Sequence, residues 1–232
     1  MIAALFPSEF FLDNSDRAGY DFLAFHISVW ARYCQQGIGA PVGVHPSQLQ
    51  KHGTTKTNHG QRLPYPSKDL AHNPDGAEIL QNILAPLSQF ISDQMKRLIP
   101  HEFEVLQEYL YHLPLFMETP CYPFMGCVVN FCVATSAHTD PCDKLICVVI
   151  PFGDFQGGEL CLYEPGLVFS LQPGEILMFP SHKITHFNLH FKGKRGSFVL
   201  SSDKSMDSFV DGSNGWEEFV HKHSSIPPPS PT

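Results

Sequence analysis

The chain has 232 residues, of which 43% are hydrophobic and 12% aromatic, so it can bury the core of one globular domain. Its formal net charge of -8 at pH 7 gives no general attraction for phosphate backbones or anionic membranes. The composition therefore excludes nucleic-acid binding through overall charge alone, and any such contact would need a local basic patch.

The N-terminus and the cysteines bear on where the protein resides. Residues 1–11 are apolar but lack a basic leader and a small-residue cleavage site, so we interpret them as packed structure. No stretch approaches the roughly 18 consecutive apolar residues of a membrane span. Seven cysteines are an odd number, and several lie in apolar segments, which is typical of reduced thiols. We therefore expect an intracellular protein, nuclear or cytoplasmic, with no membrane partner and no indicated obligate protein partner.

The N-terminal half predicts two helices and a long irregular segment. Residues 16–34 carry apolar side chains without a clean period, so the sequence does not define their structure. Residues 36–75 are rich in Gly, Pro, His, Thr and Asn and predict a long loop or lid. Apolar residues at helical spacing predict an amphipathic helix over residues 77–98, kinked at Pro86. A second helix is predicted over residues 100–112, with proline as a favourable first-turn residue.

After Pro120 the sequence changes to short apolar runs separated by Gly and Pro. Strands are predicted over residues 127–134, 145–152, 159–163, 167–171, 176–179, 186–191 and 197–201. Turns are expected at Gly157-Gly158 and at Gly193-Lys194, among others. Short strands joined by such turns predict an antiparallel sandwich or barrel. The proline-rich residues 226–232 predict a disordered tail.

His138 and Asp140 form the first part of a candidate metal site. In an extended backbone, side chains two residues apart leave the same face and can grip one ion. With 13 histidines in the chain, such a triplet also arises by chance. Its position between two predicted strands, at what would be the mouth of a barrel, favours the metal site.

A third ligand must come from His182, His186 or His190, which recur at every fourth position. On a helix this spacing would place three imidazoles on one face and indicate a zinc site. Pro180 opens the segment, however, and polar and apolar residues alternate from His186 onward, which favours a strand.

Arg195 and Ser197 favour His186 among the three. A turn at Gly193 would fold the chain back beside His186 and bring the guanidinium close to the metal. A planar, permanently charged guanidinium is a suitable partner for a carboxylate, and a nearby hydroxyl can share that carboxylate. The pattern therefore predicts metal ligands at one end of a site and a carboxylate clamp at the other.

The ordered set of His138, Asp140, His186, Arg195 and Ser197 resembles the motifs of the Fe(II)/2-oxoglutarate-dependent dioxygenases. Within that superfamily, segments 150–160, 172–176 and 185–188 are similar to TET/J-binding-protein-like oxygenase domains, which are numerous in fungi.

The resemblance implies an α+β fold with a double-stranded β-helix, or jelly roll. This core would occupy residues 121–225, and residues 1–120 would add helical support and a lid to the same domain. The resemblance also implies Fe(II) held by His138, Asp140 and His186. The co-substrate 2-oxoglutarate would chelate the iron and pair its distal carboxylate with Arg195 and Ser197, and O₂ would take the remaining position.

Asn130 lies on the strand that leads to the metal and is a further candidate for hydrogen bonding to 2-oxoglutarate or substrate. The reaction implied is oxidation of a substrate C–H bond with release of succinate and CO₂. A methylated base in DNA or RNA is the first candidate substrate by resemblance, although the acidic charge disfavours it. A protein side chain or small molecule is the alternative, and a catalytically silent metal-binding jelly roll is a second.

Overall fold

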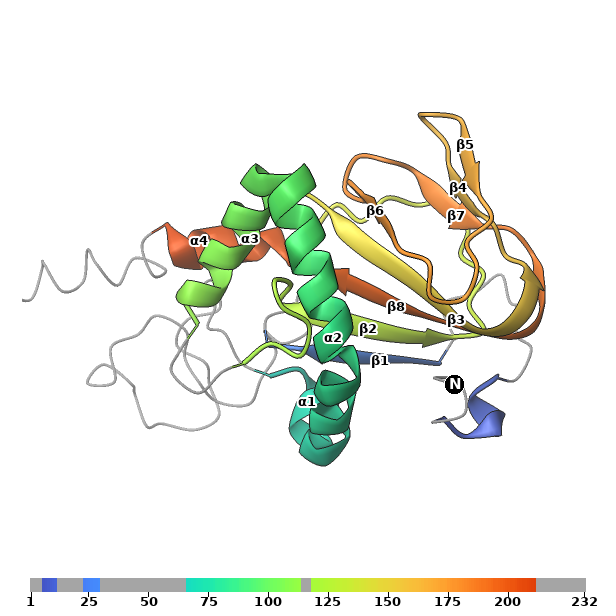
Figure 1. Ribbon diagram of the computed structural model, residues 1–232, viewed down its shortest axis with the longest axis horizontal. Helices are drawn as coiled ribbons and strands as arrows, with labels where there is room; N and C mark the ends of the chain where they lie inside the picture. The colour runs from blue at the N-terminus through green and yellow to red at the C-terminus, as the bar shows by residue number, and fades with distance from the viewer. Residues whose placement is uncertain (1–5, 12–22, 30–65, 114–117, 212–232) are drawn as a thin grey trace, which may run out of the picture.

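The computed structural model describes residues 6–11, 23–29, 66–113 and 118–211 (Figure 1). The helical elements are η2 (Ser8–Phe11), α1 (Lys68–His72), α2 (Pro74–Leu98), α3 (Pro100–Tyr111), η5 (Lys204–Met206) and α4 (Asp207–Val210). The strands are β1 (Leu23–Ser28), β2 (Gly126–Phe131), β3 (Cys147–Gly157), β4 (Leu160–Leu162), β5 (Leu167–Phe169), β6 (Leu177–Phe179), β7 (His186–Asn188) and β8 (Phe191–Ser201). Within this part of the chain, no helix is both long and apolar enough to cross a membrane.

The strands form two antiparallel sheets. The large sheet has the order β1-β2-β8-β3-β6, and the small sheet has the order β5-β4-β7. Figure 1 shows the small sheet beside one end of the long strands β3 and β8, with α2 and α3 toward the other end. The predicted antiparallel, mixed helix-and-sheet architecture is confirmed.

Alternation along the long strands divides the large sheet into two different faces. Val129 and Phe131 of β2 and Leu200 of β8 pack in the same cluster as the buried residues of α2 and α3. Cys147 and Val149 of β3 pack instead with residues of the small sheet. Because neighbouring strand residues point to opposite faces, one face of the sheet is covered by helices and the other faces the small sheet. The cavity described below lies on this second face.

Both predicted helices are present. Asn73 caps α2, because its side chain accepts a hydrogen bond from the Gly76 amide at 3.1 Å, and Pro74 occupies the first turn. Helix α2 continues through the exposed Pro86 and ends at Leu98; Ile99 caps it, and α3 begins at Pro100. The helix predicted from residue 77 therefore begins three residues earlier than expected.

The predicted loop over residues 36–75 is wrong at its C-terminal end. Residues 36–65, and with them the expected lid, lie outside the described residues, as does the predicted tail at 226–232. Residues 68–72 form α1, for which Ser67 is the N-cap and accepts from the Leu70 amide at 3.4 Å. Capping side chains stabilise this short helix even though it lacks a hydrophobic period.

The region predicted as helical support also contributes β1, an edge strand of the large sheet.

The predicted turn at Gly193-Lys194 is also wrong. Strand β8 runs straight through Gly193, which pairs with Phe155 of β3. Only residues 189–190 separate β7 from β8, and the antiparallel register with β4 and β3 continues across this break. Gly193 has φ +102°, and a Cβ there would lie 2.4 Å from the Asp154 carbonyl oxygen. This glycine therefore permits a close approach of two strands. Gly157 and Gly158, with φ +82° and +74°, lie at the end of β3 and have the positive φ expected of them.

Candidate metal and co-substrate site

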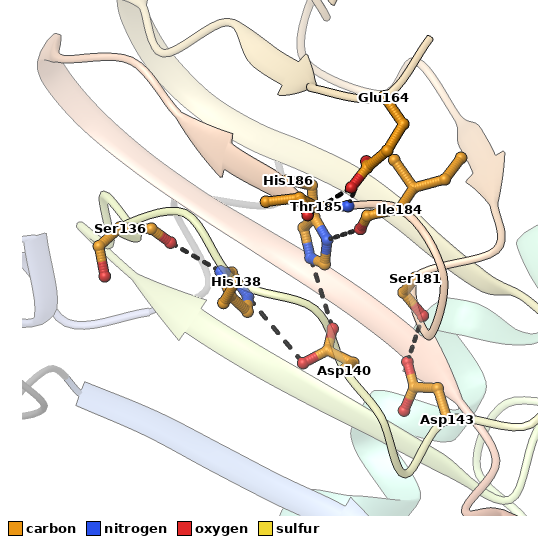
Figure 2. A network of polar contacts seen from close by, with 9 residues as sticks. All are labelled: Ser136, His138, Asp140, Asp143, Glu164, Ser181, Ile184, Thr185 and His186. Carbon is orange, nitrogen blue, oxygen red and sulfur yellow. Dashed lines mark hydrogen bonds and ion pairs between the residues drawn. The ribbon is translucent and has the colours of Figure 1, made fainter.

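Three side chains from two separate segments meet on the inner face of the sheets. Potential ligand atoms of His138, Asp140 and His186 all lie within 4.8 Å of one another. His186 Nε2 is 3.4 Å from Asp140 Oδ2, and His138 Nε2 is 3.9 Å from Asp140 Oδ1 (Figure 2). Within the described ranges, no other group of three or more His, Cys, Asp or Glu side chains has this spacing.

Backbone pairing brings the two segments together. His138 and His186 form an isolated antiparallel bridge, with amide-to-carbonyl distances of 3.1 and 2.8 Å in the two directions. The Asp140 amide donates to the Ser181 carbonyl at 3.0 Å. The loop after β2 is therefore attached to β7 and to the turn before it, although 48 positions separate the two histidines in number.

The two imidazoles are oriented by backbone carbonyls. His138 Nδ1 lies 2.7 Å from the Ser136 carbonyl oxygen, and His186 Nδ1 lies 3.0 Å from that of Ile184 (Figure 2). Because a carbonyl oxygen only accepts, each Nδ1 carries the hydrogen and each neutral ring has its lone pair at Nε2. Both lone pairs thus face Asp140, as metal-binding imidazoles require.

Burial and neighbouring groups shift two pKa values at this cluster. Burial lowers the pKa of His186, but the Asp140 carboxylate and the Ile184 carbonyl both favour the protonated ring, and together they raise the pKa above its ordinary value. Burial raises the pKa of Asp143 to about 7, although the Ser181 hydroxyl donates to its carboxylate at 2.6 Å. Ser181 therefore contacts Asp143 through its side chain and Asp140 through its backbone.

Arg195 lies in the same cavity as the three-residue cluster and is 3% exposed. Its guanidinium lies 5.4 Å from the ring centre of Phe155 and 5.6 Å from that of Phe191. Nη1 makes one long hydrogen bond of 3.5 Å to the Val133 carbonyl, and Nε has no hydrogen-bond partner among the described residues. Burial lowers the pKa of Arg195 to about 10. A buried guanidinium without a carboxylate partner in the described chain is a site for an anion.

The cavity that joins these groups has a volume of about 480 Å³. Ser197 and Asn130 also line it, and they are paired neighbours on β8 and β2. All six residues predicted for the site therefore line one cavity. His182 and His190, the alternatives for the third ligand, are not part of the cluster or the cavity lining.

The residues fit an Fe(II) ion and a keto acid. Two imidazole nitrogens and one carboxylate oxygen are the donor set of non-haem Fe(II) oxygenases, which leave positions open for other ligands. The partnerless Nε of Arg195 fits the carboxylate of a co-substrate. His26 of β1 and Asn188 of β7 also line the cavity but were not identified from the sequence. For His26, the only available signal was the alternation in residues 23–28.

Comparison with known proteins gives results only at the level of structure. No protein-family model matches the sequence, and no curated protein matches it. The structure of NgTET1 in complex with 5mC DNA matches with a TM-score of 0.54 and 19% identity, over 63% of this chain and 58% of the NgTET1 chain. A 2OG-Fe(II) oxygenase family protein from Burkholderia pseudomallei matches with a TM-score of 0.31 and 24% identity, over 34% of this chain and 42% of that one.

The likeness to NgTET1 defines the class of fold. The chain has the jelly-roll fold of the Fe(II)/2-oxoglutarate oxygenases, which confirms the fold class expected from the motifs. NgTET1 is the particular protein to which the fold is similar, so the predicted resemblance to TET-like oxygenase domains is confirmed as a likeness of fold. This chain spans a little over half the length of NgTET1, and the Burkholderia match is too partial to carry a conclusion.

Proposed function

We propose that this protein is an Fe(II)- and 2-oxoglutarate-dependent dioxygenase that oxidises a C–H bond of its substrate. His138, Asp140 and His186 would hold the iron, and Arg195 with Ser197 would hold the distal carboxylate of 2-oxoglutarate. One observation carries the proposal: a two-histidine, one-carboxylate cluster and a buried guanidinium without an anionic partner in the described chain share one cavity.

Each protein group has a definite task in this reaction. When bound, iron and 2-oxoglutarate supply the reductive activation of O₂, coupled to oxidative decarboxylation of the keto acid to succinate and CO₂. His138 and His186 offer neutral Nε2 lone pairs, because their Nδ1 hydrogens are donated to backbone carbonyls. Asp140 supplies the negative charge. Arg195 orients the keto acid through its other carboxylate, and Asn130 lies beside Ser197 to contact it or the substrate.

The apolar walls of the cavity have a protective task. Val149, Leu160 and Val199 line the cavity between the two sheets. Apolar side chains at this place exclude water from the cavity, which limits side reactions with water during the proposed oxidation.

A methylated nucleic-acid base is the substrate class that we propose. NgTET1, whose fold is similar, was solved in complex with 5mC DNA. The net charge of -8 means that this chain would have to bind nucleic acid through local contacts. A protein side chain or a small molecule, oxidised by the same mechanism, is the alternative substrate.

The proposal is tested by measuring succinate formed from 2-oxoglutarate by the purified full chain. We expect formation that requires Fe(II) and O₂, stops on chelation, and falls below detection in His138→Ala. The exposed His101→Ala in α3 is the matched control and should retain wild-type activity. Metal binding with no succinate formation under any tested substrate would contradict the proposal and identify a silent metal-binding jelly roll instead.

A further inference from the structure

The edge strand β1 forms a second wall of the cavity, and Ala24 and His26 line it. β1 pairs with β2 along its whole length, and β2 pairs in turn with β8. His26 stands opposite Val128, which stands opposite Val199. The His26 backbone is therefore two strand spacings, or about 10 Å, from Val199.

Register places His26 at the metal end of the cavity. The ring of His186 packs on Phe179 with centroids 4.9 Å apart, and Phe179 pairs with Cys147 of β3. Val199 pairs with Val149, which is two residues along β3 from Cys147, the partner of Phe179. Arg195 lies four residues farther along β8, or about 13 Å in an extended strand. Along the strands, His26 is therefore two residues from the level of Phe179 and His186 and four residues from that of Arg195, which places it nearer the metal cluster than the carboxylate clamp.

The backbone around His26 is fixed by residues just before and within α1. The His26 amide donates to Asp69 Oδ2 at 2.8 Å, and the Ser67 hydroxyl donates to the His26 carbonyl. Ser28 and Ser67 are also bonded: the Ser67 amide donates to the Ser28 carbonyl at 2.7 Å, and the Ser28 amide donates to the Ser67 hydroxyl at 3.1 Å. These bonds occupy backbone groups on the edge of β1 that faces away from β2. They fix the backbone of His26, whose side chain lines the cavity.

The charge of this part of the cavity restricts what it can recognise. Burial lowers the pKa of His26, against the opposing effect of Asp69, so its ring is neutral at neutral pH, with one donor and one acceptor nitrogen. Among the described residues, Asp140 and Arg195 are the only lining groups with a permanent formal charge. Both already have partners in the proposed site. A cationic methylammonium or a second carboxylate would therefore find no counter-charge among the described lining residues.

We propose that His26 determines substrate specificity by hydrogen bonding to the polar ring edge of a neutral methylated base, which holds the methyl group beside the metal. The inference rests on the proposed function and adds to it a residue and a mode of recognition. A neutral ring with both a donor and an acceptor suits such an edge, because it can pair with a carbonyl or ring nitrogen on one side and an amino group on the other.

The test measures binding and turnover separately. Without O₂, Fe(II)- and 2-oxoglutarate-loaded protein is titrated against a fluorescent oligonucleotide carrying 5-methylcytosine, and anisotropy is read. We expect His26→Ala to weaken binding about tenfold or more, His26→Gln to recover part of the loss, and His72→Ala in α1 to match wild type. The KM for 2-oxoglutarate should stay within about twofold of wild type in both His26 variants, because His26 is proposed to contact the base and not the co-substrate. The exposed His72→Ala should match wild type in this KM and in the rate of succinate formation.

Several outcomes would overturn the inference. His26→Ala could bind the oligonucleotide as His72→Ala does, or could raise the KM for 2-oxoglutarate, which would place His26 on the co-substrate side. Wild-type protein could also prefer a trimethyllysine peptide or a dicarboxylate to the oligonucleotide, which would contradict recognition of a neutral base. If binding depends on His26 but no succinate forms, recognition is supported and the proposed oxidation fails instead.

Discussion

The Arg195 end of the cavity lies on a long strand inside the large sheet, whereas the metal end lies on a loop and on the three-residue strand β7. Arg195 and Ser197 are 3% and 7% exposed, and both neighbours of β8 pair with it over many residues. The side chains of His138 and Asp140 are 36% and 39% exposed and depend on a few backbone bonds.

The two ends also differ in electrostatics: the more exposed metal end has its charges paired within the protein, whereas the buried guanidinium does not among the described residues. At the metal end, Asp140 already contacts both imidazoles, and Ser181 bonds to the neighbouring Asp143. At the other end, the buried guanidinium has no carboxylate partner among the described residues. The sheet thus fixes the position of a charge that lacks a carboxylate partner in the described chain. The loop carries charges that already contact one another but are more exposed to solvent. Substitutions at the two ends should therefore affect binding and stability differently.

The largest effect is expected for loss of a metal ligand. His186→Ala removes the buried imidazole of the cluster, so affinity for Co(II) or Mn(II), measured by calorimetric titration, should fall more than about 100-fold. His182→Ala and His190→Ala are matched controls, because these histidines come from the same segment but do not line the cavity. A comparable loss in either control would show that His186 is not the third ligand.

The next effect distinguishes the two ends directly. Arg195→Met should weaken 2-oxoglutarate binding by about 2 to 4 kcal/mol, or roughly 30- to 1,000-fold, and leave metal affinity unchanged. Because Arg195 is buried without a carboxylate partner among the described residues, its removal should also stabilise the ligand-free protein by about 1 kcal/mol or more in urea unfolding. Lys194→Met, at the exposed neighbouring cation, is the control for both measurements. A less stable variant that binds 2-oxoglutarate normally would refute the clamp.

The smallest effect concerns the support of Asp140. Ser181→Ala leaves the backbone bond to Asp140 but removes the hydroxyl that donates to Asp143 at 2.6 Å. That hydrogen bond stabilises the charged form of Asp143 and connects Asp143 to the turn that holds Asp140. Its loss should therefore loosen the turn and reduce metal affinity about tenfold. The exposed Ser170→Ala serves as control. If metal affinity is unchanged, the Ser181 hydroxyl has no part in positioning the ligand loop.

The residues of the candidate site were predicted from the sequence better than the fold around them. His138, Asp140, His186, Arg195 and Ser197 stand in an ordered pattern that local spacing and residue chemistry make recognisable, and the structure brings all five into one cavity. Their roles as ligands and clamp remain predictions until tested. The reversal placed at Gly193 was wrong because a glycine that admits a close strand neighbour looks the same in sequence as a turn glycine.

The contribution of β1 could not be predicted for a different reason. Its pairing with β2 joins residues about a hundred positions apart, and its short alternation gives little signal by itself. Likewise α1 depends on capping by Ser67 rather than on hydrophobic spacing. Such features depend on contacts between residues far apart in the chain, so the place of His26 in the cavity follows from the sheet order and not from the local sequence.

The bonds from Ser67 and Asp69 to β1 also have a consequence for self-association. An edge strand with unpaired amides and carbonyls can recruit a strand from another molecule and start aggregation. Here the His26 amide and carbonyl and the Ser28 amide and carbonyl are all occupied by Ser67 or Asp69. At these positions the large sheet cannot be extended by an incoming strand, so the same contacts that fix the cavity wall also protect the solubility of the fold.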